Sequence, residues 1–183
     1  MLTGQRVNDN NSYVRINRIN YRGRTKQSGR SAGQVARWCT IFSQECRRRG
    51  IRLTAQRLAI YRALASDATH PTADAIYAAL REEVSGLSRA TVYRMLESLQ
   101  LGGFVRRVST VDGIARYDAN LVPHQHLVCR QCRSILDTGG EWLRPPELPR
   151  RGPAGFIPEM LDLCIIGICA RCRRSGERRR DAN

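Results

Sequence analysis

Residues 88–103 read SRATVYRMLESLQLGG, a sequence typical of one capped amphipathic helix. The hydroxyl of Ser88 can accept a hydrogen bond from a free backbone N–H of the first turn. Apolar residues then recur at the i, i+3, i+4 and i+7 positions that form one helical face, namely Val92, Met95, Leu96 and Leu99. Two glycines end the pattern. We therefore expect a helix whose polar face carries Arg89, Thr91, Tyr93 and Arg94.

Two strand-like segments, 104–108 and 114–118, follow this helix. The turn between them contains Asp112-Gly113, a pair that suits the backbone angles of a tight hairpin. The helix and the hairpin together predict the end of a winged helix, a fold that places one helix in the major groove of DNA.

Three further helices are predicted upstream. Helical periodicity begins at Gln34 and ends at a glycine at residue 50, and it places Cys39 and Cys46 on one face, where we expect them in the core. Thr54 and Thr72 can cap the second and third helices. We therefore assign residues 34–120 to a winged-helix DNA-binding domain.

After Pro123 the sequence changes to short β-type runs, 126–128, 134–136 and 161–168, around two cysteine pairs. This change marks a small C-terminal α/β domain over residues 121–176 and gives the α+β fold class for the whole chain. Five of the seven prolines fall within residues 145–158, which argues against a long regular helix there.

The two ends of the chain are polar and basic. Residues 1–33 contain few large apolar side chains, so we expect a disordered basic arm, which is either an inert or over-extended start or a segment that clamps DNA. Residues 177–183 are expected to form a basic tail.

The charge balance favours a polyanionic partner. Lysine and arginine number 31 against 16 aspartates and glutamates, a formal net charge of +15, and phosphate contacts release counterions from nucleic acid. Lys26 is the only lysine, however, so genome-wide arginine usage explains the excess equally well.

No apolar run approaches the roughly 20 residues of a membrane span, and the polar start lacks a signal peptide's hydrophobic stretch. We expect a cytoplasmic protein with no membrane partner.

Four cysteines occur as two C-x-x-C pairs, Cys129 with Cys132 and Cys169 with Cys172. Four thiolates in two such pairs are the ligand set of a tetrahedral structural zinc ion, which would tie the end of the chain to the first strand of its domain. Unliganded core cysteines and a redox-active pair are the alternatives, and the paired spacing favours zinc.

The chain has only three histidines, His70, His124 and His126. Strand alternation places the last two on the same side, and Asp118 and Asp137 lie nearby in the sequence. Three imidazoles and two carboxylates suit ferrous iron or manganese, with zinc possible. Taken singly, His70 can instead cap a helix and Asp118 can be a turn carboxylate. If His70 lies near the others, the site joins both domains.

These residues resemble the ferric uptake regulator family of metal-responsive repressors, over residues 50–137 and the final cysteine pair. The resemblance rests on four segments: RLTAQR at 52–57, HPTADAIY at 70–77, SRATVYR at 88–94 and HQHLVCRQC at 124–132. Two features resemble the peroxide-sensing repressor branch of the family. One is aspartate at 118 and 137, where iron-uptake members commonly carry glutamate, and the other is the presence of both cysteine pairs.

The resemblance implies a homodimer, formed through the C-terminal domain, that represses transcription from an inverted-repeat operator in double-stranded DNA. It implies structural Zn²⁺ on Cys129, Cys132, Cys169 and Cys172, and regulatory Fe²⁺ or Mn²⁺ on His70, Asp118, His124, His126 and Asp137. In that branch peroxide reacts at the bound iron and oxidises a ligand histidine, so His70 and His124 are the candidates here. An iron- or manganese-responsive uptake repressor without peroxide chemistry is the alternative within the family.

Three features depart from the family pattern. Pro123 and Gln125 replace ligands of the auxiliary metal site found in many members. The proline-rich stretch replaces the long helix expected after Asp137, which leaves the dimer interface open, and the basic arm is unusually long.

For DNA, Ser88, Arg89, Thr91, Tyr93 and Arg94 are the expected base-reading set, because Arg89 can bond guanine and Tyr93 can contact thymine methyl groups. Phosphate contacts are expected from Arg52, Gln56 and Arg57 of the second helix and from Arg106, Arg107 and Arg116 of the wing. A merely solvated helix face is the alternative.

Two hypotheses from other classes remain. A ferrous oxygenase would use His124, His126 and one aspartate as a facial triad, but the sequence predicts neither a β-barrel nor a substrate pocket, so we do not expect an enzyme. A zinc-ribbon RNA-binding module is the other, and the capped helix and wing argue against it.

Overall fold

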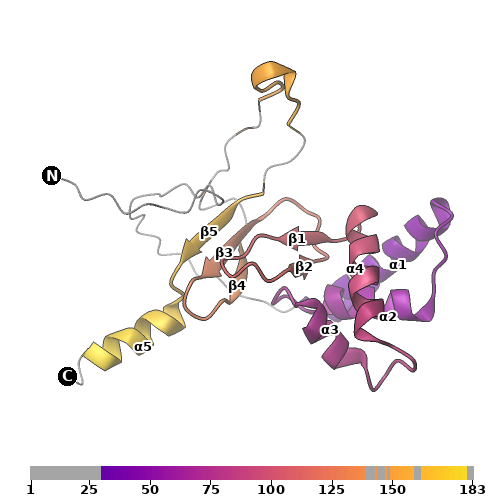
Figure 1. Ribbon diagram of the computed structural model, residues 1–183, viewed down its shortest axis with the longest axis horizontal. Coiled ribbons are helices and arrows are strands. Elements are labelled where there is room, and N and C mark those ends of the chain that lie inside the picture. The colour runs from indigo at the N-terminus through magenta and orange to yellow at the C-terminus, as the bar shows by residue number, and fades with distance from the viewer. Residues whose placement is uncertain (1–29, 139–142, 144–146, 148, 159–161, 181–183) are drawn as a thin grey trace.

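The computed structural model describes residues 30–138, 143, 147, 149–158 and 162–180. Four helices and a hairpin lead into a three-stranded sheet and a final helix, with the hairpin between the helices and the sheet (Figure 1). The elements are α1 (Ala32–Arg48), α2 (Ala55–Ser66), α3 (Ala73–Leu80), α4 (Arg89–Leu101), β1 (Arg106–Val108), β2 (Arg116–Asp118), β3 (Gln125–Cys129), β4 (Ile135–Thr138), the short 3₁₀ turn η1 (Pro153–Gly155), β5 (Cys164–Gly167) and α5 (Ala170–Arg180).

Each of the first four helices begins after a hydroxyl side chain that accepts a backbone N–H of the first turn. The three predicted caps, Thr54, Thr72 and Ser88, are confirmed, and each such cap contributes about 1 kcal/mol. Ser31 caps α1 in the same way, so this helix begins at Ala32, within the stretch expected to be the arm. Residues 1–29 of that expected arm lie outside the described residues.

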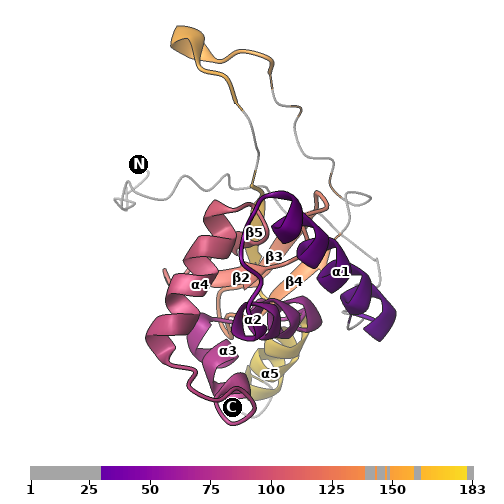
Figure 2. The same cartoon turned by 90° about the vertical axis from the view of Figure 1, so that its right-hand side faces the viewer.

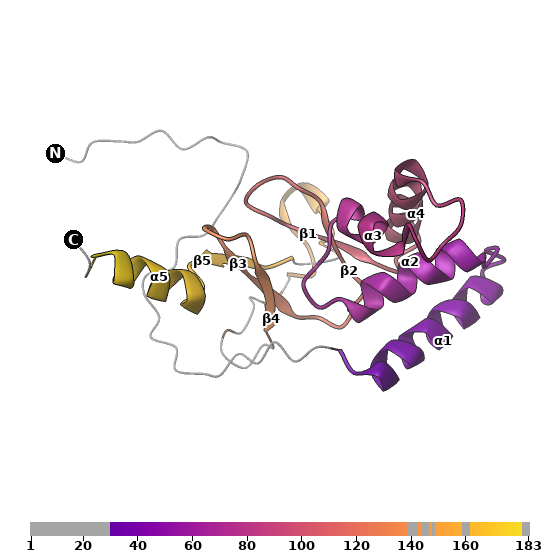
Figure 3. The same ribbon diagram turned by 90° about the horizontal axis from the view of Figure 1, so that it is seen from below.

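The helical core forms where α1 and α4 flank α2 on opposite sides (Figure 2), with α1 lying along α2 (Figure 3). Phe42 stacks on Tyr61 with ring centroids 4.1 Å apart and meets the edge of Phe104 at 4.9 Å. Cys39 and Cys46 are buried in this core, as predicted. Because Phe104 packs here, β1 is shorter than the strand predicted over 104–108.

The hairpin carries one extra pairing. Thr72 forms an isolated bridge with Arg116 of β2, and the Tyr117 N–H donates to the Pro71 carbonyl at 3.2 Å. His70, just before this pairing, has a φ of 60°, a left-handed conformation that is uncommon outside glycine and is often found at functional sites. The pairing holds His70 beside the end of β2.

The C-terminal sheet has the strand order β4-β3-β5, with β4 antiparallel and β5 parallel to β3. The register pairs His126 with Asp137. Val108 of the hairpin packs with Val128 and Ile135 of the sheet in a small second core. This contact joins the two halves of the molecule.

Two segments bear on the C-terminal expectations. Among the described residues of the proline-rich stretch, the only regular element is η1, in line with the predicted lack of a long helix. The helix α5 extends to Arg180, so it covers part of the expected basic tail. Within the described part of the chain, we find no helix with the length and apolar character that crossing a bilayer requires.

Candidate metal centres

Three histidines and two aspartates converge where the hairpin meets the C-terminal sheet. His70 precedes α3 and Asp118 ends β2, whereas His124 directly precedes β3, His126 lies on β3 and Asp137 lies on β4. One ligand atom from each side chain lies within 4.8 Å of all the others. The structure therefore brings together all five residues that the sequence singled out, from both sides of residue 120.

The spacing of these atoms fits a single ion. The Nε2 atoms of His124 and His126 are 3.0 Å apart, His70 Nε2 lies 2.8 Å from Asp137 Oδ1, and His124 Nε2 lies 3.1 Å from Asp118 Oδ2. The other imidazole–carboxylate distances reach 3.9 Å. Ligand atoms about 2.1 Å from one transition metal are ~3.0 Å apart at a right angle and ~3.6 Å apart at 120°.

Burial explains why a cation belongs there. The side chains of His70 and Asp118 are 0% and 1% exposed. His70 Nε2, Asp118 Oδ2 and Asp137 Oδ1 have no hydrogen-bond partner within the described residues. Because unpaired buried polar atoms are costly, a bound ion would supply the missing partner. Two carboxylates would neutralise a divalent charge, and the mixed nitrogen and oxygen set suits Fe²⁺, Mn²⁺ or Zn²⁺.

The charges of the site are already arranged for metal binding. Burial alone would raise the pKa of Asp118, but the nearby imidazoles of His124 and His126, the hydrogen bond from the Asn120 backbone N–H and the charge of Arg30 lower it overall. Burial likewise opposes protonation of His124, yet the Asp118 carboxylate, whose Oδ2 lies 3.1 Å from His124 Nε2, raises the pKa of this imidazole above its usual value. The carboxylate is therefore ionised, and a proton competes with metal for His124.

Two arginines that the sequence analysis placed elsewhere lie beside this site. Arg30 was assigned to the disordered arm, but its side chain is 6% exposed and bonds Asp118. Arg116 was assigned to phosphate contacts, but it is partly buried and its Nη1 donates to the His70 carbonyl at 3.4 Å. Nothing in the sequence around either residue distinguishes it from the other arginines.

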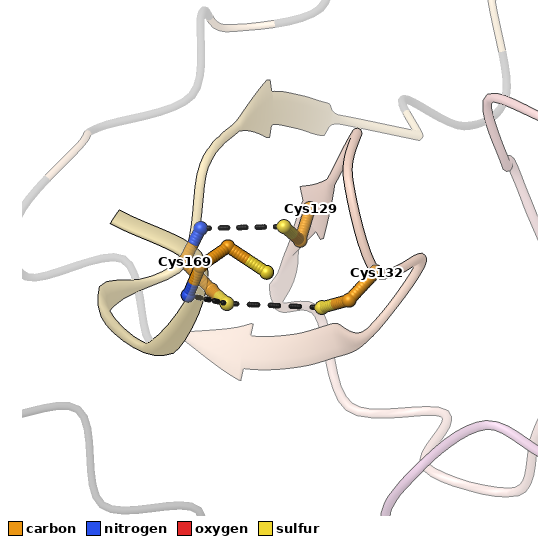
Figure 4. Close-up of side chains that lie close together, drawn as sticks. Cys129, Cys132 and Cys169 are labelled. Carbon is orange, nitrogen blue, oxygen red and sulfur yellow. Dashed lines mark hydrogen bonds between the residues drawn. The ribbon is translucent and has the colours of Figure 1, made fainter. Parts of the chain in front are cut away.

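The four cysteines form a second cluster between the end of β3 and the start of α5, and Figure 4 labels three of them, Cys129, Cys132 and Cys169. Cys132 Sγ and Cys169 Sγ are 3.7 Å apart, close to the ~3.8 Å edge of a tetrahedron with zinc–sulfur bonds of about 2.3 Å. Backbone N–H groups donate to two of the sulfurs, Cys169 N to Cys129 Sγ at 3.3 Å and Cys172 N to Cys169 Sγ at 3.5 Å. The four-cysteine set and its spacing therefore fit structural zinc.

The polar face of α4 is exposed, and its side chains are held by local contacts. Arg89 Nη1 lies 2.6 Å from Asp74 Oδ1, and the Tyr93 hydroxyl donates to Asp74 Oδ2 at 3.2 Å. The Ser88 hydroxyl accepts the Thr91 N–H at 3.1 Å. The Asp74 carboxylate of α3 therefore fixes the orientation of two expected base-reading residues.

The remaining expected DNA contacts differ in their surroundings. Arg52, Arg94 and Arg107 are exposed, whereas Gln56, Arg57, Arg106 and Arg116 are partly buried. Arg57 Nε lies 3.2 Å from the Met95 sulfur, and Arg106 donates to the Leu121 carbonyl. Arg116 contacts the backbone of a candidate metal ligand, the His70 carbonyl.

Solved structures establish the fold independently. The Helicobacter pylori ferric uptake regulator Fur aligns with a TM-score of 0.59 at 18% identity, over 80% of this chain and 97% of that one. A zinc uptake regulator complexed with zinc and DNA aligns with a TM-score of 0.56 at 21% identity, over 78% and 97%. Both structures support a winged-helix half followed by a C-terminal domain.

Sequence relatives establish the family. The Peroxide-responsive repressor PerR of Staphylococcus aureus strain Mu50 is 37% identical over 127 residues, which cover 69% of this chain and 86% of the relative. The protein of the same name from strain USA300 is 36% identical over the same shares. The sequence model of the ferric uptake regulator family matches residues 48–144, more than half of the chain. On this match and these identities, the chain belongs to the ferric uptake regulator family.

Proposed function

We propose that the protein is a metal-dependent, DNA-binding transcriptional repressor that senses peroxide through a regulatory Fe²⁺ or Mn²⁺ site. The observation that carries this proposal is the convergence of His70, Asp118, His124, His126 and Asp137 on one point. The similarity to peroxide-responsive repressors supports the choice of signal. A regulator needs a site that binds its metal ion reversibly, and this site does not have to turn over a substrate.

The position of the site suggests how the metal would control DNA binding. Its ligands come from both sides of Asn120, and the apolar contact between the halves is small, with only Val108, Val128 and Ile135 buried in it among the described residues. A shared ion would therefore favour one orientation of the halves. Converting a mostly inactive population into a mostly active one needs about 5.5 kcal/mol of differential binding, which a five-ligand site can supply.

Each half has its own proposed role. Zinc on the four cysteines would hold the C-terminal domain together, and two copies of the chain would dimerise through that domain. The dimer would present two α4 helices to the half-sites of an inverted repeat, as two-fold symmetry requires. The zinc uptake regulator complexed with zinc and DNA has the same fold, which supports DNA as the partner of this chain. We infer action in the cytoplasm, where bacterial DNA lies.

A small oxidant has a route to the site. A cleft of about 420 Å³ is lined by two of the candidate ligands and by basic and acidic side chains, among them His124, His126, Arg106, Arg107 and Asp162. Bound iron would supply the electron that cleaves the O–O bond of peroxide. His70 and His124 hold their imidazoles where this chemistry would occur, so they remain the proposed sites of oxidation.

One experiment tests this function. The purified dimer is footprinted on the promoter region of its own gene with Fe²⁺, Mn²⁺ or a chelator, before and after peroxide, and its peptides are weighed by mass spectrometry. We expect protection with either metal, none with chelator, and loss of protection with one added oxygen on His70 or His124 only in the iron-loaded sample. Metal-dependent protection that survives peroxide, with unmodified histidines, would instead support an uptake repressor.

A further inference from the structure

The guanidinium of Arg30 is anchored at the C-terminal end of α2. Its Nη1 lies within hydrogen-bond distance of three backbone carbonyls there, Leu64 at 3.2 Å, Ala65 at 3.4 Å and Asp67 at 3.1 Å. The last carbonyls of a helix lack partners within the helix and carry its partial negative charge, so they attract a cation. This contact fixes Nη1 of the guanidinium at the end of α2.

The second terminal nitrogen of the Arg30 guanidinium, Nη2, reaches the metal-ligand cluster. Its Nη2 bonds Asp118 Oδ1 and lies 3.9 Å from Asp137 Oδ2. Trp38 of α1 covers the guanidinium, with the ring centroid 5.0 Å from Cζ. The side chain is 6% exposed, so a buried, planar cation connects α1, α2 and two candidate metal ligands.

This contact decides which oxygen of Asp118 can face the ion. Oδ1 accepts from Arg30 and also from the Asn120 N–H at 2.9 Å. Oδ2 has no hydrogen-bond partner among the described residues and lies 3.1 Å from His124 Nε2. The carboxylate is therefore held with one oxygen occupied by protein and the other directed into the cluster.

We propose that Arg30 is a positioning residue of the regulatory metal site, which holds Asp118 as a single-oxygen ligand and joins the segment before α1 to that site. This inference rests on the proposed function, because it concerns the same ion. It also gives residue 30 a role that no sequence motif indicates.

The planar fork of arginine is what the geometry requires. One nitrogen meets the α2 carbonyls while another meets Asp118, and the flat face packs on Trp38. A lysine ammonium keeps the charge but cannot make both contacts or the same stacking. Arg30→Lys therefore tests the positioning of Asp118 while the positive charge at residue 30 is kept. Removing the charge altogether, as in Arg30→Gln, also removes repulsion of the incoming cation, which opposes the loss of positioning.

The experiment compares the full chain with Arg30→Lys, Arg30→Gln and the control Arg37→Gln. Arg37 is an exposed arginine of α1, so its replacement changes the net charge without touching the site. Mn²⁺ affinity is measured by competition with a chelating dye, and the ligand-field absorption of added Co²⁺ reports the geometry of the ligands. Thermal unfolding identifies a temperature at which every variant is folded.

We expect Arg30→Lys to bind Mn²⁺ about tenfold more weakly, as removal of an outer-shell partner usually does, with altered Co²⁺ bands. Arg37→Gln should match the parent protein in both measurements. Should Arg30→Lys fold poorly, Trp38→Leu takes its place, because it leaves Arg30 unchanged but removes the ring that packs on the guanidinium. We expect this variant to bind Mn²⁺ more weakly than the parent, by a smaller factor than Arg30→Lys.

Parent-like Mn²⁺ affinity and Co²⁺ bands in folded Arg30→Lys, or in Trp38→Leu if it takes its place, overturn the inference. The parent protein and His124→Ala provide the separate check on the proposed function. If His124→Ala binds Mn²⁺ as tightly as the parent, the five-ligand site itself is wrong, and both proposals fall. If His124→Ala loses Mn²⁺ affinity but Arg30→Lys binds Mn²⁺ like the parent, the inference about Arg30 fails and the proposed function stands.

Discussion

His70 Nε2 lies 2.8 Å from Asp137 Oδ1, although His70 precedes α3 and Asp137 lies on a strand of the C-terminal sheet. This pair closes the candidate site across the junction between the two halves. A cation held by both residues would resist any separation of the hairpin from the sheet. The proposed link between metal binding and DNA binding would therefore depend on this contact.

Removal of the negative charge at Asp137 should break that link. Asp137→Asn is expected to weaken Mn²⁺ binding by about a hundredfold or more, since even outer-shell changes cost 10- to 100-fold. Metal-dependent operator binding should be lost with it. Asp112→Asn is the matched control, because Asp112 is a hairpin-turn carboxylate whose Oδ1 accepts the Ile114 N–H, which an asparagine oxygen can also do. Equal Mn²⁺ affinity in the two variants would contradict the assignment.

Loss of zinc should unfold the C-terminal half. Cys172→Ser is expected to abolish zinc binding at the four-cysteine cluster and to lower the free energy of unfolding by several kcal/mol, since zinc binding is part of the folding free energy of small domains. Cys164→Ser is the control, because Cys164 lies on β5 but outside the cluster. Zinc content and thermal unfolding are measured together. A Cys172→Ser protein with the zinc content and stability of Cys164→Ser would rule out this role.

The helix α4 should determine operator recognition. Arg89→Ala and Tyr93→Ala are each expected to weaken specific binding by about 1–3 kcal/mol, the usual range for a good base contact. Arg37→Ala removes the same charge as Arg89→Ala from α1, on the other side of α2, and should change specific binding little. Gel-shift titrations against operator and unrelated DNA measure the difference. Unchanged operator affinity in both α4 variants would refute the base-reading assignment.

Metal binding should weaken as the pH falls. Although burial opposes its protonation, the adjacent Asp118 carboxylate raises the pKa of His124 above its usual value, and only neutral imidazole binds metal. The proton therefore begins to compete above the usual histidine range, and the apparent Mn²⁺ affinity should fall with pH from there downward. Titrations between pH 8 and 6 with a pH-independent competitor check this. An affinity that stays constant across this interval would exclude His124 as a ligand.

Local signals in the sequence explain which parts of the fold were predictable. Thr54, Thr72 and Ser88 are capping residues placed directly before periodic apolar runs, and the C-x-x-C pairs carry their chemistry in their spacing. Ser31 is a capping residue of the same kind, but the polar composition of the preceding residues favoured a disordered arm up to residue 33. In these regions neighbouring residues determine the structure, so a single sequence is sufficient.

Contacts between distant segments were less predictable. The five candidate ligands were identified by residue type and resemblance, and their convergence needs the Thr72–Arg116 pairing and the His126–Asp137 register. Arg30 had no local signal at all, because its partners lie in α2 and at the end of β2. The arginine-rich helix α5 lacks the apolar periodicity by which a helix is recognised in a sequence.

Anomalous diffraction from crystals grown with Mn²⁺ tests the central claim most directly. The account predicts one manganese peak per chain within about 2.0–2.3 Å of His70, His124 and His126 Nε2, Asp118 Oδ2 and Asp137 Oδ1. Manganese bound elsewhere, or bound there without His70, would contradict it.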